Sequence, residues 1–197
     1  IRDRSGNVIS SNKIGDCKGN GICANNGGRT LNVASTDNKI TGNIINNTLN
    51  DGIYIGTGST GTVISKNDVG VSNKSGIVVL DSKKCQVISN KVSDCRLDGI
   101  YLKNIGDTDI KSNNVTTVKR YGVQVISSQL KSLYGNTITG NGNCGLRIIQ
   151  SGISGSQQNR LRNNGSSYAV YSRNSTGSVL VRLPASARIT RNTARIT

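Results

Sequence analysis

The sequence lacks five residue types altogether. Its 197 residues include no Glu, His, Phe, Trp or Met, and a single proline, Pro184. Without histidine the chain has no Ser-His-Asp or Cys-His nucleophile system and no histidine ligand for zinc. No run of about 18 apolar residues occurs, which is the length that a membrane-spanning helix needs. We therefore expect no metal ion, no cofactor and no membrane span.

Acidic residues are scarce and unevenly placed. The chain has 25 Lys and Arg against 10 acids, all of them Asp, for a formal charge of +15. Residues 1–109 hold 13 basic and 10 acidic residues, a net charge of +3, whereas residues 110–197 hold 12 basic residues and no acid, a net charge of +12. Such asymmetry concerns partners rather than fold, and it indicates an anionic partner.

The five cysteines form no recognisable framework. Their odd number argues against a disulfide scaffold. No pair has CxxC spacing, which argues against a metal site built from cysteines. We interpret them as buried or simply unpaired thiols: Cys17, Cys23, Cys85, Cys95 and Cys144.

A repeat of about 23 residues organises the chain. Asparagine sets its register at seven positions separated by 31, 24, 23, 23, 23 and 23 residues, namely Asn12, Asn43, Asn67, Asn90, Asn113, Asn136 and Asn159. Aliphatic residues keep the same phase two residues after each asparagine, and glycine keeps it nine residues after the first six. A fixed period of this length is typical of solenoids.

Each repeat contains three short β-branched segments that alternate inward and outward, which excludes helices. Such segments bury their inward residues only by stacking on equivalents in neighbouring turns, and parallel crossovers are right-handed. The sequence predicts an all-β fold over residues 1–181, a right-handed single-stranded parallel β-helix of about seven rungs of ~23 residues. We expect the asparagines to stack through side-chain hydrogen bonds and the glycines to supply tight turns.

Two stretches depart from the repeat. The first turn is eight residues longer than most, and we expect the additional residues to form a loop over 25–37. Beyond Val181 the pattern ends, so residues 182–197 are predicted to be a cap, a tail or a link to missing sequence. The chain starts with Ile1 rather than Met, which suggests a piece of a longer chain.

The recurring phrase N-x-I … G-I-x-I, from about Asn7 to Val181, resembles the right-handed β-helix repeats of the pectin-lyase-like superfamily. The resemblance implies a secreted or cell-surface protein that acts on or binds polysaccharides. It transfers no catalytic residue, because the Trp-Ile-Asp-His, Asn-Thr-Asp, Asp-Asp, Gly-His-Gly and Asp-Pro-His signatures of its enzymes are absent from this chain.

Outward positions are the candidates for function, because inward ones fill the core. Eleven residues after each asparagine, the expected outward column is Cys23, Tyr54, Val78, Tyr101, Gln124, Arg147 and Val170. Cations and tyrosines gather along this column and the turn before it, where they suit the carboxylates or sulfates and the ring faces of an acidic glycan. For any single cation, a solvated turn is the alternative interpretation. The candidate substrate-binding residues are Tyr54, Lys74, Arg96, Tyr101, Lys119, Arg120 and Arg147.

Two aspartates occupy the same position of the repeat, two rungs apart. They begin the segments DGIYI at 51–55 and DGIYL at 98–102. Asp51 and Asp98 would lie roughly 9–10 Å apart, near the ~6.5–9.5 Å of inverting glycosidases. Lys103 is a candidate base for a lyase. Against catalysis, Asp before Gly-Ile suits a turn, and nearby Lys and Arg are expected to lower a pKa that a general acid needs raised.

The pattern favours an extracellular β-helix module that binds an acidic polysaccharide or cell-surface glycan without cleaving it. The alternative is a carbohydrate-active enzyme, either a polysaccharide lyase or a glycoside hydrolase. Nucleic acid matches the charge of +15 less well, because the chain has no nucleic-acid motif and no stacking platform of aromatic residues.

Overall fold

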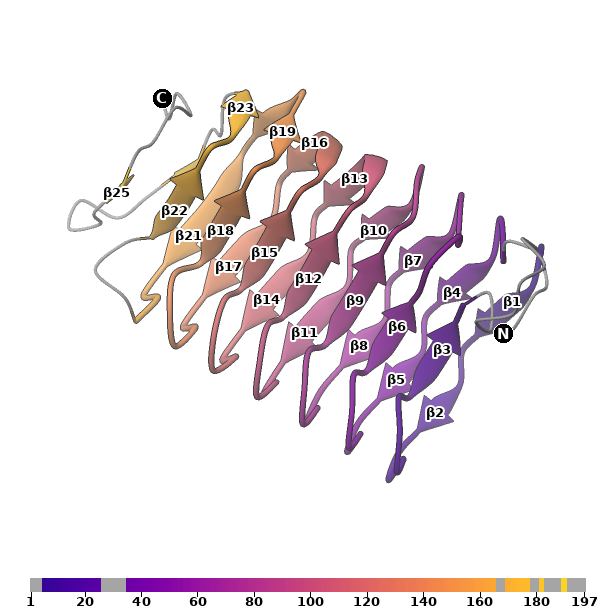
Figure 1. Cartoon of the computed structure of the whole chain (residues 1–197). Helices are drawn as coiled ribbons and strands as arrows, with labels where there is room; N and C mark the ends of the chain where they lie inside the picture. Colours follow the sequence, from indigo (N-terminus) through magenta and orange to yellow (C-terminus); the bar gives the residue numbers. More distant parts are fainter. Residues whose placement is uncertain (1–4, 26–34, 166–168, 178–180, 183–188, 191–197) are drawn as a thin grey trace.

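The computed structural model describes residues 5–25, 35–165, 169–177, 181–182 and 189–190. Figure 1 shows the chain winding into a coil of short strands, in which each turn stacks on the one before. The described elements are all strands, and they form three sheets with parallel pairing. The predicted all-β fold, a right-handed single-stranded parallel β-helix, is confirmed.

Each turn contributes one strand to each sheet. Sheet 1 runs in the order β1 (Val8–Ser10), β4 (Lys39–Thr41), β7 (Val63–Ser65), β10 (Gln86–Ile88), β13 (Gly106–Lys111), β16 (Gln129–Tyr134), β19 (Gly152–Ile153) and β23 (Thr176–Gly177), with β20 (Ser156–Gln157) also paired to β16. Sheet 2 runs in the order β2 (Lys13–Ile14), β5 (Ile44–Ile45), β8 (Asp68–Val69), β11 (Lys91–Ser93), β14 (Asn114–Thr116), β17 (Thr137–Thr139), β21 (Asn159–Arg162) and β24 (Val181–Arg182).

Sheet 3 lies at the front in Figure 1. It runs in the order β3 (Ile22–Ala24), β6 (Ile53–Ile55), β9 (Ile77–Leu80), β12 (Ile100–Lys103), β15 (Val123–Ile126), β18 (Leu146–Ile149), β22 (Val170–Arg173) and β25 (Ile189–Thr190). Each sheet stacks eight strands along its main path, and several near the ends have only two residues. The number of turns therefore differs slightly from the predicted seven.

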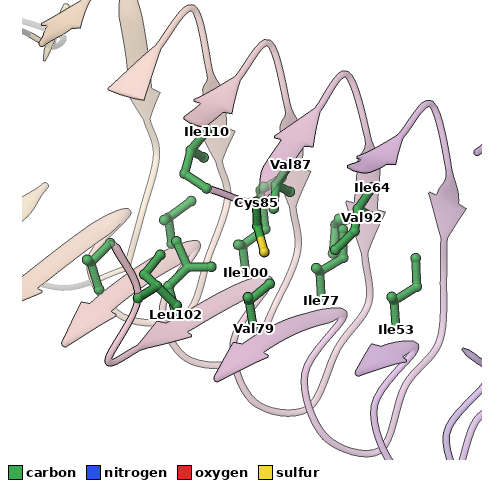
Figure 2. Packing of buried hydrophobic residues seen from close by; sticks show 14 of the residues in the cluster. Ile53, Ile64, Ile77, Val79, Cys85, Val87, Val92, Ile100, Leu102 and Ile110 are labelled. Carbon is green, nitrogen blue, oxygen red and sulfur yellow. The ribbon is translucent and has the colours of Figure 1, made fainter. Parts of the chain in front are cut away.

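The core is built from inward columns in register. In sheet 3 the pairing joins Ile53, Ile77, Ile100, Val123 and Leu146, and all five side chains are fully buried. Figure 2 shows such side chains from successive turns stacked along the interior. Branched aliphatic residues suit this narrow, closely packed interior, in keeping with the absence of Phe, Trp and Met from the sequence.

A buried asparagine column runs beside the aliphatic ones. Asn113 donates through Nδ2 to Asn136 Oδ1 at 3.0 Å and to the carbonyl oxygen of Val87 at 2.8 Å. Its own Oδ1 accepts hydrogen bonds from N and Nδ2 of Asn90, both at 3.0 Å. The same links recur between neighbouring turns from Asn12 to Asn159. The predicted stacking is confirmed, and it satisfies backbone groups that the bend leaves unpaired.

The glycine column has a different physical reason from the one predicted. Its glycines from Gly21 to Gly145 do not have positive φ angles, so they are not there to form left-handed turns. A Cβ added at Gly99 would overlap Val115 Cγ1 of the next turn and come within 2.7 Å of the Gly122 carbonyl oxygen. Glycine is needed because the turn packs directly against the following rung.

The last sheet 3 strands correct the predicted outward column. Arg147 pairs with Tyr171 and not with Val170. The stretch between Leu161 and Val170 holds one residue more than in the preceding turn, since Ile138 pairs with Leu161 but Leu146 pairs with Val170. Val170 is therefore fully buried, and Tyr171 lies half-buried on the outer face.

Two predictions concern stretches that are largely outside the described residues. Most of the expected loop at 25–37 lies in residues 26–34, and most of the expected end segment at 182–197 lies in residues 183–188 and 191–197. The division of the chain at residue 181 and the loop both remain predictions.

Substituting one rung of the ladder tests its contribution to stability. Asn113→Ala should lower the free energy of unfolding by roughly 3 kcal/mol or more, because buried partners in both neighbouring turns lose their hydrogen bonds. The neighbouring exposed Asn114→Ala, at the first residue of β14, should change it by no more than about 0.5 kcal/mol. Urea denaturation followed by circular dichroism measures both; equal effects would contradict a structural role for the column.

Candidate functional site

Four polar side chains stack on the outer face of sheet 3. Tyr101, Gln124, Arg147 and Tyr171 occupy equivalent positions in the adjacent strands β12, β15, β18 and β22. Since successive side chains of a strand alternate between faces, the buried residues beside them fix these four side chains on the outside. The rung register thus brings together residues that are up to 70 positions apart in the sequence.

Asp98 lies at the edge of this group, two residues before β12. Its side chain is buried, with a relative exposure of 4%. Oδ1 accepts a hydrogen bond from the backbone N–H of Tyr121 at 3.2 Å and lies 3.8 Å from Nε of Arg120. Oδ2 accepts a hydrogen bond of 2.9 Å from the side-chain amide of Gln124, in the amide orientation that satisfies both neighbours of that group. Both carboxylate oxygens therefore have partners.

Arg147 is held on three sides. The side-chain carbonyl of Gln124 accepts a hydrogen bond from its guanidinium group, in the same amide orientation. The guanidinium carbon lies 5.1 Å from the ring centre of Tyr121 and 5.9 Å from that of Tyr171. Arg120 contacts the Tyr121 ring as well, at 5.3 Å. A cation between two tyrosine faces is stabilised by the ring quadrupoles and restricted in its rotamers.

Burial dominates the electrostatics of Asp98. Loss of solvent raises the pKa of this carboxyl group, and the charges of Arg120 and Arg147 together with the N–H of Tyr121 offset only part of that increase. The expectation that nearby cations would leave the pKa lowered is wrong for this group. We call the cluster of Asp98, Arg120, Tyr121, Gln124, Arg147 and Tyr171 the arginine–tyrosine site.

Asp51 lies two rungs away from Asp98. Its Oδ1 accepts a hydrogen bond from the backbone N–H of Ser75 at 2.9 Å, and the side chain of Asn20 accepts one from the backbone N–H of Asp51 at 3.0 Å. Burial raises the pKa of Asp51, while the Ser75 bond and the charge of Lys74 lower it. Asp51 and Asp98 are members of one edge column whose side chains accept backbone hydrogen bonds from the next turn, which is a structural task.

The other expected residues surround the arginine–tyrosine site without joining it. Tyr101 is its neighbour on β12, and Tyr54 lies on β6, two strands further along sheet 3. Lys103 is exposed at the far end of β12. The exposed cations Lys74, Arg96 and Lys119 occupy the turns that precede sheet 3.

Three members of the site were not among the predicted site residues. Tyr121 and Gln124 lie at the positions that the repeat predicts for them. Nothing in the sequence, however, indicated that the Gln124 amide would link Asp98 to Arg147. Tyr171 was not expected on the outer face, because a constant repeat of 23 residues placed Val170 in the outward column instead. The breakdown of the glycine column at Tyr168 was the available signal of an additional residue.

The part of the chain that the structure describes offers no suitable soft-metal site. It has no His and no Met, and no group of three His, Cys, Asp or Glu gathers within the described residues. Burial raises the pKa of Cys85 and Cys144 to about 11 and that of Cys95 to about 12, so these thiols stay protonated near neutral pH. Soft-metal sites are built from clustered thiolate, thioether or imidazole ligands, and the described residues offer no such cluster. Among the described ranges, no helix has the length and apolarity needed to cross a bilayer.

The pKa of Asp98 predicts a specific pH dependence of stability. Because the folded pKa is raised above 3.8, the stability that Asp98 contributes is present below about pH 3.8 and is lost as the pH rises through the folded pKa. The free energy of unfolding of wild type relative to Asp98→Asn should therefore fall over this range.

Asp109 provides the opposite control. Burial raises its pKa, but the hydroxyl of Ser132 and the ammonium of Lys111 outweigh that effect, and the net direction is lower. Wild type should gain stability relative to Asp109→Asn as the pH rises toward about 3.8. Denaturation curves from pH 3 to 7 compare both variants; the same sign for both would contradict the assignment.

Solved structures share this fold at low identity. The enzymatically active domain of tailspike protein 2 from bacteriophage CBA120 matches with 14% identity and a TM-score of 0.74, over 96% of this chain and 34% of the other. The A-module of mannuronan C-5 epimerase AlgE4 from Azotobacter vinelandii matches with 16% identity and a TM-score of 0.76, over 98% and 57%. The periplasmic alginate epimerase AlgG matches with 21% identity and a TM-score of 0.58, over 76% and 45%.

This chain spans between about a third and somewhat over half of the length of those three structures. No curated protein matches its sequence. A family model described as "Periplasmic copper-binding protein (NosD)" matches residues 1–170. Because that match covers most of the 197 residues, the chain belongs to the NosD family.

Proposed function

We propose that this chain is a non-catalytic β-helix module that binds an acidic polysaccharide on the outer face of sheet 3, outside the cytoplasm. The observation that supports this proposal is that the guanidinium group of Arg147 is held in place by its neighbours. Its guanidinium lies against the rings of Tyr121 and Tyr171 and is bonded to Gln124, which is in turn bonded to the buried Asp98.

A fixed guanidinium is suited to recognising a carboxylate. Arginine presents several N–H donors in one plane, and one of those of Arg147 is used on Gln124. The side chain remains only half-buried, so an anion can approach it from solvent. Since its rotamer is already restricted, binding costs less side-chain entropy than at a freely moving arginine.

The neighbouring aromatic and cationic residues suit the rest of an acidic glycan. Tyr101, Tyr121 and Tyr171 are half-buried, so each offers an apolar body and a polar hydroxyl at the surface. Exposed cations in the preceding turns, Lys74, Arg96 and Lys119, extend the positive potential along the stack. An acid-free second half with a net charge of +12 would steer a polyanion toward this face.

The names of two structural neighbours support the same ligand class. Two of the proteins named above are epimerases of mannuronan or alginate, and the third is the enzymatically active domain of a phage tailspike. The NosD description names the periplasm, which suits a location outside the cytoplasm. Its reference to copper does not enter the proposal, because the ligands present here do not suit that metal.

Contacts of the candidate catalytic groups favour binding over cleavage. Asp98 already has a partner on each oxygen, and Asp51 is engaged by the backbone of Ser75. Lys103 is exposed at the end of β12 and is not part of the arginine–tyrosine site. One observation favours the alternative of a lyase or hydrolase: the raised pKa of Asp98, in a cluster with cations, is a feature of many general acids.

Alanine substitution tests the binding face. Arg147→Ala should weaken binding of an alginate octasaccharide by about ten- to a hundredfold, since a charged hydrogen bond to a carboxylate is lost. Arg160→Ala, an exposed arginine on β21 in sheet 2, should change the affinity by less than about twofold. Titration calorimetry at low and physiological salt measures both; equal losses would show only a non-specific attraction to the total charge.

A product assay distinguishes binding from cleavage. Incubation of the protein with alginate and hyaluronan should produce neither new reducing ends nor unsaturated uronates. Products that form with wild type and disappear with Asp98→Asn would establish the enzyme instead. The Asp109→Asn protein, altered on sheet 1, controls for a general effect of removing an acid.

A further inference from the structure

A hollow lies along the corner where sheet 3 passes into sheet 1. Its volume is about 580 Å³, and it extends over several turns of the coil, from the one that contains Lys83 to the one that contains Thr176. In Figure 1 the arrowheads of β12, β15 and β18 point toward this edge, where β13, β16 and β19 begin. The corners that line it have two residues each, of which the first adopts a positive φ, as in Asn104, Ser127 and Gln150.

Glycine positions in the wall, where no side chain projects, help to form the hollow. Lys83, which forms an isolated bridge to Gly106, and the first residues of β13, β16, β19 and β23 stack in the order Lys83, Gly106, Gln129, Gly152 and Thr176. A long or branched side chain therefore alternates with glycine along the wall. At Gly152 the space is partly taken, because the Gln129 amide lies over it.

Nothing in the backbone requires glycine at position 106. Its φ is not positive, and an added Cβ would make only ordinary contacts with Lys83, at 3.5 Å to Cγ and 4.0 Å to Cδ. This differs from Gly99, where the next turn leaves no room for a side chain. The fold does not explain the open space at Gly106, and a ligand would.

The side chains that line the hollow suit a ligand that carries uncharged hydroxyl groups. It consists mainly of amides and hydroxyls, which both donate and accept hydrogen bonds, as sugar hydroxyls do. Asn104 is oriented by a 2.9 Å hydrogen bond from its Nδ2 to Asp81, and Gln129 by a 3.2 Å bond to Ser154. The lining has one charged residue, Lys83, and no acid.

The hollow continues the arginine–tyrosine site along the same strands. Arg147 is followed three residues later by Gln150, just as Gln124 is followed by Ser127. At about 3.3 Å per residue, the two places lie roughly 10 Å apart. Ile126 and Ile149, both half-buried on the outer face, form an apolar surface between them. One extended ligand can contact both.

We propose that the hollow is a second subsite that binds an uncharged sugar unit, next to the acidic unit held at Arg147. This inference rests on the proposed function and refines it. The ligand is then a glycan in which acidic and neutral units alternate, running along the strands β15 and β18 and over the corner. A polymer charged at every unit would occupy only the arginine–tyrosine site.

Two oligosaccharides and two pairs of variants test this subsite. The probes are a hyaluronan octasaccharide, which alternates uronate with a neutral sugar, and an oligomannuronate of the same length, which is charged at every unit. Gly106→Leu fills the hollow, and Gly155→Leu adds the same side chain at an exposed glycine between β19 and β20 that is also open. Gln150→Ala removes an amide from the lining, and Asn163→Ala removes one from an exposed residue of similar φ at another corner.

Wild type should bind the alternating octasaccharide more tightly than oligomannuronate. Gly106→Leu and Gln150→Ala should each weaken hyaluronan binding by about five- to tenfold, the loss expected for one or two hydrogen bonds, and leave oligomannuronate unchanged. The two control variants should match wild type. Unchanged hyaluronan affinity in both hollow variants, or binding of oligomannuronate alone, would overturn the subsite while the proposed function stands. Binding of neither probe would overturn both.

Discussion

The structure depends on the hydrogen bonds that join each turn to the next in constant register. A buried asparagine amide can be tolerated only if all of its donors and acceptors are satisfied. Here each amide between the two ends of the column bonds to the amides above and below and to a carbonyl of the preceding turn, as Asn113 does with Asn90, Asn136 and Val87. A slip of one residue would bury unpaired polar groups, so the ladder fixes which residues stack. The same register then decides which outward residues become neighbours.

This constraint explains why so much of the fold could be predicted. The core columns repeat in the sequence because each inward position meets its own equivalent, so the asparagine and aliphatic columns specify the coil directly. Two features depend on details that the repeat does not contain. The additional residue between Leu161 and Val170 moved Tyr171 outward, and the close approach of Val115 to Gly99 replaced turn geometry as the reason for glycine.

Part of the arginine–tyrosine site was predictable for the same reason. The repeat register placed Asp98, Arg120 and Arg147 on one face, beside their neighbour Tyr101, because outward residues share the register of the core. The amide link through Gln124 was not predictable, since it depends on rotamers and on an amide orientation. The net pKa of Asp98 was not predictable either, because the sequence shows its charged neighbours but not how deeply it is buried.

The amide between Asp98 and Arg147 has a consequence for charge. A direct ion pair would place a carboxylate on the guanidinium and neutralise it at the surface. With Gln124 between them, Arg147 is oriented by a neutral carbonyl while Asp98 stays buried behind it, closer to Arg120. The cluster of two cations and one acid keeps a net charge of +1 if Asp98 is ionised, and the half-buried Arg147 lies against the rings of Tyr121 and Tyr171. The burial of Asp98 therefore fixes the position of Arg147 without neutralising it, which is the state that binding an external anion requires.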